Sequence, residues 1–435
     1  MKKNFITLIV VVCLFGCKKN DQNPYRSANA ASHVTATGGP NIILIVADDV
    51  GFEIPRCDGG ESYQTPNLDS MATAGIRFTN CHGAPECSPS RFMILTGKYN
   101  FRNYEKWGYM DPSEKTIGNM FRDAGYATCY AGKWQLMGAE ASILSLGFDA
   151  YSVWNPDKRR NAGSRYKSPV IYQGGTYLSD SVTYNKYADD WFTDYIFGFM
   201  DTVSKPFFVY YSMSLAHSPF SPTPLDEAFT SWQPDGKSDP VFFPSMIQYM
   251  DKVIGEIMAR VDSNTVVIFV GDNGSAKEIT SIWNGTSIQG GKSTTTIYGT
   301  HVPLIVYKKG SSGYTDSSLV DFTDFLPTLA STANIPLPAY GILDGTPFYP
   351  QKSTRQWIFC HYEPYPGTKD GVLMRWVQDG TYKRYDSWGT DKTKLDKFYN
   401  IASDPYELHP ISAKKRTNHE KSVNNTFKDV LLKMQ

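Results

Sequence analysis

The sequence has no excess of charge of either sign, because 43 lysines and arginines balance 43 aspartates and glutamates among its 435 residues. No overall field therefore attracts nucleic acid, and an anionic substrate has to be bound by a local cluster of cations. Hydrophobic residues make up 41% of the chain. A chain of this length and composition can bury a large core, either as one α/β domain or as a large domain with a smaller one.

Cysteine is scarce, and the CxxC or Cys/His spacing of a zinc site is missing. Two of the seven cysteines, Cys13 and Cys17, lie in the first 17 residues, which are interpreted below as a signal peptide. The odd number that remains points to one cysteine with separate chemistry in an exported chain. The remaining cysteines are Cys57, Cys81, Cys87, Cys129 and Cys360.

A nucleotide-binding loop is also missing. The stretch IQGGKSTTT (288–296) resembles GxxxxGK[ST], but Thr286 occupies the position of its first glycine and no apolar strand leads into it. We therefore interpret Lys292 as a single anion ligand on a glycine-rich loop.

The first residues, MKKNFITLIVVVCLFGC, predict a lipoprotein signal peptide over 1–17. Their apolar run is too short to span a bilayer, and Cys17 ends a segment that resembles a lipobox. Residues 18–39 have the composition of a flexible tether. We expect an exported protein anchored by a lipid on Cys17, in the periplasm or outer membrane of a Gram-negative bacterium.

Short apolar runs alternate with amphipathic stretches along the chain, which predicts a doubly wound, mostly parallel sheet flanked by helices. The runs predicted as buried parallel strands are 41–46, 126–131, 206–212, 265–270 and 302–307, and a helix is predicted over 244–261. Ligands in such folds bind beyond the carboxyl ends of the strands.

Polar residues follow four of these strands. Asp48 and Asp49 follow the first, Lys133 the second and His217 the third, and Asp272 and Asn273 follow the fourth. Each alone would be an ordinary capping or turn residue. Together the carboxylates and the amide offer the oxygen ligands of a hard cation such as Ca²⁺. Lys133, His217, Lys292 and Arg91 add positive charge and donors, which favours a sulfate or phosphate ester as substrate.

Cys87 lies in the stretch APECSPSRFMILTG (84–97), between prolines and next to polar residues. A buried core role fits this neighbourhood poorly, so we expect a rigid polar turn at Cys87. A helix starting at Arg91 would direct its N-terminal N–H groups toward the turn, and this arrangement suits an anion.

These residues resemble the signature of the type I sulfatases of the alkaline phosphatase superfamily. The resemblance rests on CSPSR (87–91) with LTG (95–97), and continues in the same order through the motifs ADD (47–49), TPNLD (65–69), GKW (132–134), HSPF (217–220), GDNG (271–274), GGK (290–292), THVPLIV (300–306) and SDPYEL (403–408).

The resemblance implies a mechanism. Cys87 would be converted by a formylglycine-generating enzyme into formylglycine, whose hydrated form attacks the sulfur atom of the ester and later releases sulfate. Calcium would be bound by Asp48, Asp49, Asp272 and Asn273 together with residue 87. By the same resemblance, Arg91 and Lys133 would orient the hydrated aldehyde, Lys292 and His217 would bind sulfate, and His217 would protonate the leaving oxygen.

The sequence departs from the family at two places. Gln135 stands where many members have a histidine, and an amide cannot act as a base. Tyr298 and His301 lie in a stretch where a glutamate is common. Neither departure affects the predicted metal ligands or Cys87, and we assign Gln135 and His301 to substrate binding.

The C-terminal part changes character. The runs 357–363, 372–378 and 381–387 predict antiparallel strands, with a tight turn at Asp379 and Gly380. We therefore expect a catalytic domain over 40–335 and a smaller antiparallel domain over 336–435. His361, Tyr362 and the loop 364–368 either select the substrate or fill a domain interface.

The sequence thus predicts a calcium-dependent sulfatase that acts on sulfated sugars. Two alternatives remain: a phosphodiester or phosphonate ester hydrolase of the same superfamily, and a catalytically idle lipoprotein that binds sulfated glycans.

Overall fold

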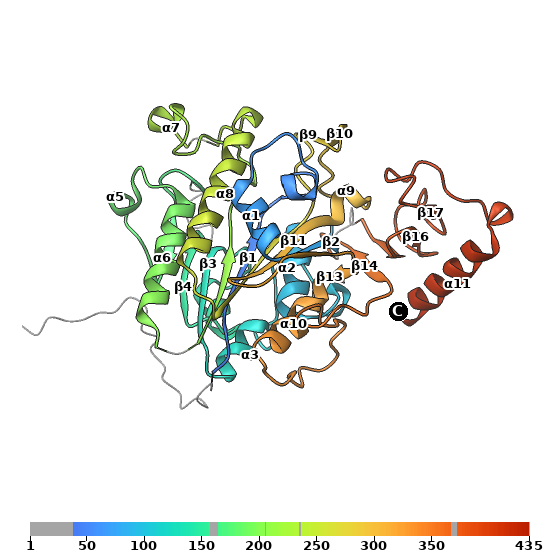
Figure 1. Ribbon diagram of the computed structural model, residues 1–435, viewed down its shortest axis with the longest axis horizontal. Helices are drawn as coiled ribbons and strands as arrows, with labels where there is room; N and C mark the ends of the chain where they lie inside the picture. The colour runs from blue at the N-terminus through green and yellow to red at the C-terminus, as the bar shows by residue number, and fades with distance from the viewer. Residues whose placement is uncertain (1–37, 157–163, 205, 235, 367–371, 435) are drawn as a thin grey trace, which may run out of the picture.

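The computed structural model describes residues 38–156, 164–204, 206–234, 236–366 and 372–434 (Figure 1). The predicted signal peptide, and all but the last two residues of the predicted tether, lie outside this part of the chain. No helix within the described residues is long and apolar enough to cross a membrane.

One large mixed sheet forms the centre of the molecule. Its strand order is β12-β2-β11-β8-β1-β7-β3-β4-β5-β6, and β13 pairs with β2. The strands are β1 (Asn41–Ala47), β2 (Ile76–His82), β3 (Ala127–Lys133), β4 (Ala150–Trp154), β5 (Ile171–Gln173), β6 (Thr176–Tyr177), β7 (Phe207–Ser212), β8 (Thr265–Gly271), β11 (His301–Lys308), β12 (Tyr314–Asp316) and β13 (Val320–Asp321).

The middle of the sheet is parallel, as predicted. Strand β1 pairs in parallel with β7 and β8, β3 pairs in parallel with β7, and β4 continues this pattern. The carboxyl ends of these strands therefore meet at one edge, where the residues after each strand come together.

The prediction of a parallel strand over 302–307 is wrong in direction. Strand β11 is antiparallel to both β8 and β2. Because β11 is fully covered on both faces, its sequence is as continuously apolar as that of a buried parallel strand. An apolar run reports burial and does not report strand direction.

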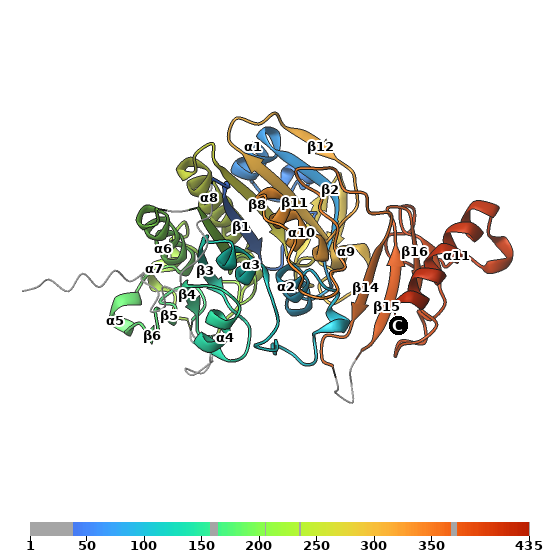
Figure 2. The same ribbon diagram turned by 90° about the horizontal axis from the view of Figure 1, so that it is seen from below.

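Helices cover both faces of the sheet (Figures 1 and 2). Alternate side chains of β1 point into two separate clusters, with Ile42 and Leu44 in one and Ile43 and Ile45 in the other. The first cluster lies under α2 (Cys87–Thr96), α3 (Ile117–Asp123) and α10 (Phe325–Thr332), and the second lies under α1 (Pro66–Ala74), α6 (Ala188–Thr202) and α8 (Phe243–Arg260). The α8 boundaries confirm the helix predicted over 244–261.

Helix α2 begins earlier than predicted, at Cys87 instead of Arg91. Pro89 is compatible with this start because the first N–H groups of a helix have no partner within the helix. Cys87 is therefore the first residue of the helix, directly at its positive end.

A second sheet of four antiparallel strands follows: β14 (Ile358–Tyr362), β15 (Met374–Gln378), β16 (Tyr382–Tyr385) and β17 (Phe398–Asn400). Helix α11 (Asn418–Lys433) packs on β15 and β16, and this unit lies at one end of the molecule in both views (Figures 1 and 2). The predicted antiparallel strands and the turn between β15 and β16 are confirmed. The domain limits at residues 335 and 336 stay a prediction.

The remaining elements are short. They are α4 (Ala139–Ser145), α5 (Asp180–Thr183), α7 (Ala228–Ser231), α9 (Ile297–Thr300), β9 (Thr280–Trp283) and β10 (Thr286–Gln289), besides isolated 3₁₀ turns. Strands β9 and β10 form a hairpin that leads into the loop carrying Lys292. This short polar hairpin strand is unlike the buried strand that precedes a nucleotide-binding loop.

Candidate active site

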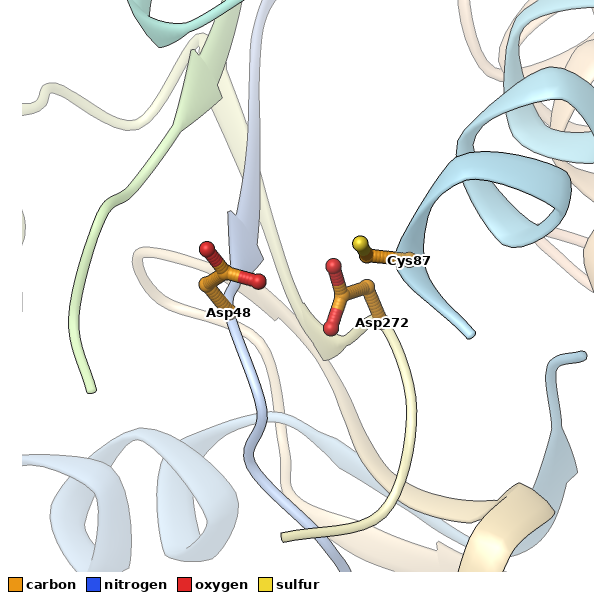
Figure 3. Close-up of side chains that lie close together, drawn as sticks. All are labelled: Asp48, Cys87 and Asp272. Carbon is orange, nitrogen blue, oxygen red and sulfur yellow. The ribbon is translucent and has the colours of Figure 1, made fainter. Parts of the chain in front are cut away.

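Cys87 lies where helix α2 points at the ends of β1 and β8 (Figure 3). Cys87 is 2% exposed, and the side-chain Nε2 of Gln135 lies 3.2 Å from the Cys87 Sγ. Burial raises the pKa of the Cys87 thiol, so the thiol stays protonated at neutral pH. Because the thiolate is the reactive form of cysteine, the unmodified side chain is a poor nucleophile here.

The acidic residues converge on Cys87. Asp48 and Asp272 follow neighbouring parallel strands, and their carboxylates face the Cys87 sulfur in Figure 3. One oxygen of each carboxylate and the Cys87 sulfur lie within 4.8 Å of one another. The backbone N–H of Asp49 donates to Asp272 Oδ1 at 3.0 Å. Asp49 adopts φ +60°, a left-handed conformation that is uncommon outside glycine and that clusters at functional sites.

Asn273 has the orientation of a cation ligand. Its Nδ2 donates to Asp49 Oδ1 at 2.8 Å and to the carbonyl of Gly274 at 2.9 Å. Its Oδ1 is buried and has no hydrogen-bond partner among the described residues. A buried acceptor without a donor is costly, and a hard cation held by oxygen ligands would satisfy it. The donor set therefore fits calcium, since it combines carboxylate and amide oxygens.

Each of the three carboxylates is paired with a different cation. Lys133 Nζ lies 2.7 Å from Asp48 Oδ2, and Lys292 Nζ lies 2.7 Å from Asp49 Oδ2. Arg91 NH2 lies 2.7 Å from Asp272 Oδ2. The sequence prediction that these cations share one site with the acidic residues agrees with this placement.

Burial and charge shift the pKa values of the acids in opposite directions. Burial alone would raise the pKa of Asp48, but the charge of Lys133 and of further cations holds it well below its usual range. Burial raises the pKa of Asp272 to about 6, although Arg91 opposes the shift. The site thus holds two acids with different proton affinities, which is common where charges are concentrated.

His217 completes this edge of the sheet. Its Nε2 lies 3.7 Å from Asp49 Oδ2, and its Nδ1 contacts the carbonyl of Ser218, which accepts a hydrogen bond and so fixes the proton on Nδ1. Burial, together with the charge of Arg165, lowers the pKa of His217 to about 3. At neutral pH the ring is neutral, with its free nitrogen facing the acid cluster.

The structure adds two residues that sequence reasoning missed. Arg91 NH1 donates to Ser212 Oγ, and Ser212 Oγ donates to the carbonyl of Lys133 at 2.6 Å. Ser212 ends β7, so the rule about strand ends could have found it. Arg165 NH1 lies 3.3 Å from Asp48 Oδ2. Arg165 lies eleven positions beyond the end of β4, and no local pattern marks it.

Two predicted substrate-binding histidines do not join this cluster. The ring of His301 is stacked on Phe52 at 4.3 Å between centroids and on His82 at 5.0 Å, and its Nε2 contacts the carbonyl of Thr79. The His361 Nε2 lies 3.3 Å from Glu363 Oε2. Both rings are therefore bound by neighbouring side chains or backbone. A sequence alone does not separate such a histidine from one that binds a ligand.

Known proteins resemble this chain over most of its described length. Residues 40–335 match the Sulfatase family. The chain belongs to the sulfatase family. Human (Homo sapiens) arylsulfatase A is 30% identical over 397 residues, which cover 80% of this chain and 74% of that protein. Arylsulfatase G of Rattus norvegicus is 28% identical over 364 residues, or 70% of this chain and 67% of that protein.

Solved structures share the fold of this sulfatase. The crystal structure of Ps i-CgsB has a TM-score of 0.74 at 21% identity, with 91% of this chain and 93% of the other covered. A structure in complex with its substrate, D-glucosamine-2-N,6-O-disulfate, has a TM-score of 0.69 at 19% identity, with 89% and 96% covered. A phosphonate monoester hydrolase of Agrobacterium radiobacter has a TM-score of 0.64 at 18% identity, with 91% and 95% covered.

Proposed function

We propose that this sulfatase removes sulfate from a sulfated saccharide, using formylglycine formed from Cys87 and a bound calcium ion. The observation that carries the proposal is the buried cluster of Asp48, Asp272 and Cys87, whose ligand atoms lie within 4.8 Å of one another. A cation at this point would touch both the acids and the modified residue. The family hydrolyses sulfate esters, and the cluster supports the finer mechanism.

Calcium would be held by Asp48, Asp49, Asp272 and Asn273, with the side chain of residue 87 as a further ligand. When bound, it supplies a positive charge that polarises the sulfate oxygens. The unpaired Oδ1 of Asn273 supports this assignment.

Formylglycine at position 87 would supply a hydrated aldehyde whose hydroxyl attacks sulfur. The chain's own residues then orient that group. Gln135 Nε2 already lies 3.2 Å from the position 87 side chain, and Lys133 lies on the Asp48 side of the same cluster. Arg91 is held by both Asp272 and Ser212, so its guanidinium is fixed before substrate binds.

Lys292 and His217 lie on the Asp49 side of the cluster, where both contact the same carboxylate. A sulfate group bound against the cation would meet the ammonium of Lys292 and the free ring nitrogen of His217. When its Nε2 carries a proton, His217 is the group placed to transfer that proton to the leaving oxygen.

A saccharide substrate is supported by the stacked rings of Trp107 and Tyr365, and by the exposed side chain of Met137 on the turn that carries Gln135. The two rings stack with centroids 5.1 Å apart, and Tyr365 is 50% and Met137 54% exposed. The Met137 N–H donates to the carbonyl of Gly108, and Gln135 at the start of the same turn contacts the position 87 side chain. Exposed aromatic surface next to a catalytic cluster suits the apolar face of a sugar ring.

The phosphonate or phosphodiester ester hydrolase remains the second candidate, because a phosphonate monoester hydrolase shares the fold. A catalytically idle glycan binder is disfavoured by the buried cysteine within the acid cluster. A binding protein has no use for an oxidisable residue at that position.

We also propose that the chain is exported and anchored by a lipid on Cys17, and that a formylglycine-generating enzyme matures it. The support is the sequence of the leader and of the CSPSR motif. Replacing Cys17 by serine should release the protein from the membrane fraction or block its processing, and a soluble wild-type protein with a mature N-terminus beyond residue 17 would contradict the anchor.

The experiment that tests the function compares turnover of an aryl sulfate and an aryl phosphate by protein matured in a competent host. We expect an aldehyde at position 87 by peptide mass spectrometry, a clear preference for the sulfate ester, and no turnover in Cys87→Ala. Full activity in protein that carries only the intact thiol would refute the mechanism, and preference for the phosphate would favour the second candidate. A screen of defined sulfated mono- and oligosaccharides would then identify the sugar.

A further inference from the structure

Arg165 lies on the segment between β4 and β5 and is held in place from both sides. Before it, the indole Nε1 of Trp154 donates to the carbonyl of Ser164 at 3.0 Å. After it, the hydroxyl of Tyr166 donates to the carbonyl of Ser214 at 2.8 Å and also to that of His217. The backbone at Arg165 is thereby attached to the end of β4 and to the turn that carries His217.

The guanidinium of Arg165 is directed into the acid cluster. Its Cζ lies 4.7 Å from the centroid of the Trp154 ring, and its NH1 lies 3.3 Å from Asp48 Oδ2. The side chain is only 10% exposed. Stacking on an indole ring restricts the guanidinium plane, so the orientation of its N–H groups is fixed before a ligand arrives.

The charge of Arg165 is not needed to neutralise the cluster. The carboxylates of Asp48, Asp49 and Asp272 are each paired at 2.7 Å with a closer cation of their own. Arg165 is the fourth cation against three acids, and a calcium ion would add to the excess. Its Nε is buried without a hydrogen-bond partner among the described residues. A buried cation in excess, with an unused donor, points to an anion that binds beside it.

We propose that Arg165 binds the sulfate group of the substrate directly, as a specificity residue outside the motifs that mark the family in this chain. The assignment rests on the proposed function. A guanidinium offers parallel N–H groups that match two oxygens of a tetrahedral anion, which an ammonium cannot do. It also supplies a positive charge in a site where Gln135, close to Cys87, is neutral.

A structural role predicts a different pattern. If Arg165 only orients Asp48, its loss should weaken calcium binding and leave sulfate binding unchanged. If Arg165 binds sulfate, its loss should weaken sulfate binding, while calcium binding stays the same or tightens because a neighbouring positive charge is removed.

The test uses full-length matured protein with saturating calcium, and inorganic sulfate as the probe. Isothermal titration calorimetry measures the sulfate Kd, and competition against 4-nitrophenyl sulfate hydrolysis gives the inhibition constant. We expect Arg165→Gln to raise both on the order of 10- to 100-fold, as for the loss of a charge-assisted hydrogen bond. Arg165→Lys keeps the charge but lacks the two parallel N–H groups of the guanidinium. Its sulfate Kd and inhibition constant should lie between those of Arg165→Gln and the wild type.

Arg77→Gln is the matched control, because Arg77 forms a similar ion pair, 2.9 Å from Asp58, at the start of β2. It should leave the sulfate Kd unchanged. An Arg165→Gln variant with normal sulfate affinity, or one whose only defect is weaker calcium binding, overturns the assignment. The calorimetry separates this result from the function itself, because a wild type that binds sulfate through Arg165 but hydrolyses no sulfate ester contradicts only the proposed function.

Discussion

At the scale of single residues, the acid cluster is arranged so that a cation can enter without breaking its scaffold. The Asn273 side chain is held by two hydrogen bonds from its Nδ2, which leaves Oδ1 free to act as a ligand. The hydrogen bond from the Asp49 N–H to Asp272 Oδ1 joins the two strand ends independently of any ion. Such fixed ligands reduce the rearrangement that binding requires.

Asn273→Ala should therefore weaken calcium binding while the fold is retained. We expect the calcium concentration for half-maximal activity to rise on the order of 10- to 100-fold, since one oxygen ligand and the support of Asp49 are lost. A chelator should abolish wild-type activity, and Ca²⁺ should restore it. Asn264→Ala is the control, because Asn264 is exposed and directly precedes β8, the strand that leads to Asn273. Unchanged calcium dependence in Asn273→Ala, or zinc at full occupancy in active enzyme, contradicts the assigned site.

Gln135 and His217 have different roles: Gln135 donates a hydrogen bond near position 87, and His217 transfers a proton. Gln135→Ala removes one hydrogen bond near position 87 and should reduce kcat by about 10²-fold or less. His217→Ala should cost considerably more. A general acid must be protonated, and burial lowers the pKa of His217 to about 3. The wild-type kcat/KM should therefore fall as the pH rises through a limb below the ordinary histidine value of about 6.5.

That limb should be missing from the pH profile of His217→Ala and present in that of Gln135→Ala. Equal and small losses in the two variants would mean that another group transfers the proton. The ring stack of His301 and the contact of His361 with Glu363 make those two histidines weak substitutes.

The residues that could be predicted from the sequence are those that follow a recognisable strand or lie in a compact motif. Asp48, Asp272 and Cys87 were found in this way, and the structure brings them together. Arg165 could not be found, because its approach to Asp48 depends on how the segment after β4 returns to the sheet. Such a return is set by tertiary contacts, which leave no periodic signal in the sequence.

At the scale of elements, the C-terminal sheet supports the loop that carries Lys292. Lys383 on β16 donates to the carbonyl of Thr295 and forms a fully buried ion pair with Glu407 at 2.8 Å. The hydroxyl of Tyr385, also on β16, contacts Thr295 Oγ1 and Glu407 Oε2. This network fixes the loop three residues beyond Lys292, so the smaller sheet helps to position an anion ligand.

Tyr385→Phe should loosen this support with little change in packing. Removing a buried hydroxyl that bonds a carboxylate should cost on the order of 1 to 3 kcal/mol. We expect a lower Tm and a higher KM for an aryl sulfate, with kcat reduced less, because Lys292 is displaced while the chemistry remains. Tyr382→Phe on the same strand is the control, since its ring stacks on Phe398. A lower Tm with unchanged KM would show that the network serves stability alone.

The predicted elements were more reliable than their directions and limits. The apolar runs located the central strands and α8 because burial on both faces requires such sequences. They did not give the antiparallel direction of β11, nor the start of α2 at Cys87. Direction depends on the connections between strands, and helix starts depend on tertiary partners for the first N–H groups.

At the scale of the whole molecule, the formal charges balance. Several carboxylates are nevertheless buried, and their ionisation at high pH lowers the free energy of unfolding. Burial raises the pKa of Asp189 to about 7 and that of Asp58 to about 6. Such groups bind protons more tightly in the folded chain than in the unfolded chain. The free energy of unfolding then decreases as the pH rises through the interval between the two pKa values. Acids with lowered pKa, such as Asp48, act in the opposite direction at lower pH.

Asp189→Asn isolates this effect away from the catalytic residues. The Asp189 carboxylate is fully buried, accepts from the Tyr211 hydroxyl at 2.9 Å through Oδ1, and has no partner for Oδ2 among the described residues. Asparagine keeps the accepting oxygen and removes the charge. The wild type should lose up to about 4 kcal/mol from this group between pH 4 and pH 8, because three pKa units correspond to that amount. The variant should lack this part of the decline.

The measurement is chemical denaturation of both proteins across that pH range at fixed calcium. The difference between them should be small at pH 4, where Asp189 is protonated and nearly isosteric with asparagine. It should grow in favour of the variant as the pH rises from about 4 to about 7, and level off above that. Asp201→Asn is the control, because that carboxylate is 59% exposed and paired with Arg260 at the surface. A constant difference across the range would mean that Asp189 stays ionised in the folded chain. Its charge would then have to be stabilised by the Tyr211 and Ser214 donors and by the more distant Arg165, linking this carboxylate to the anion site.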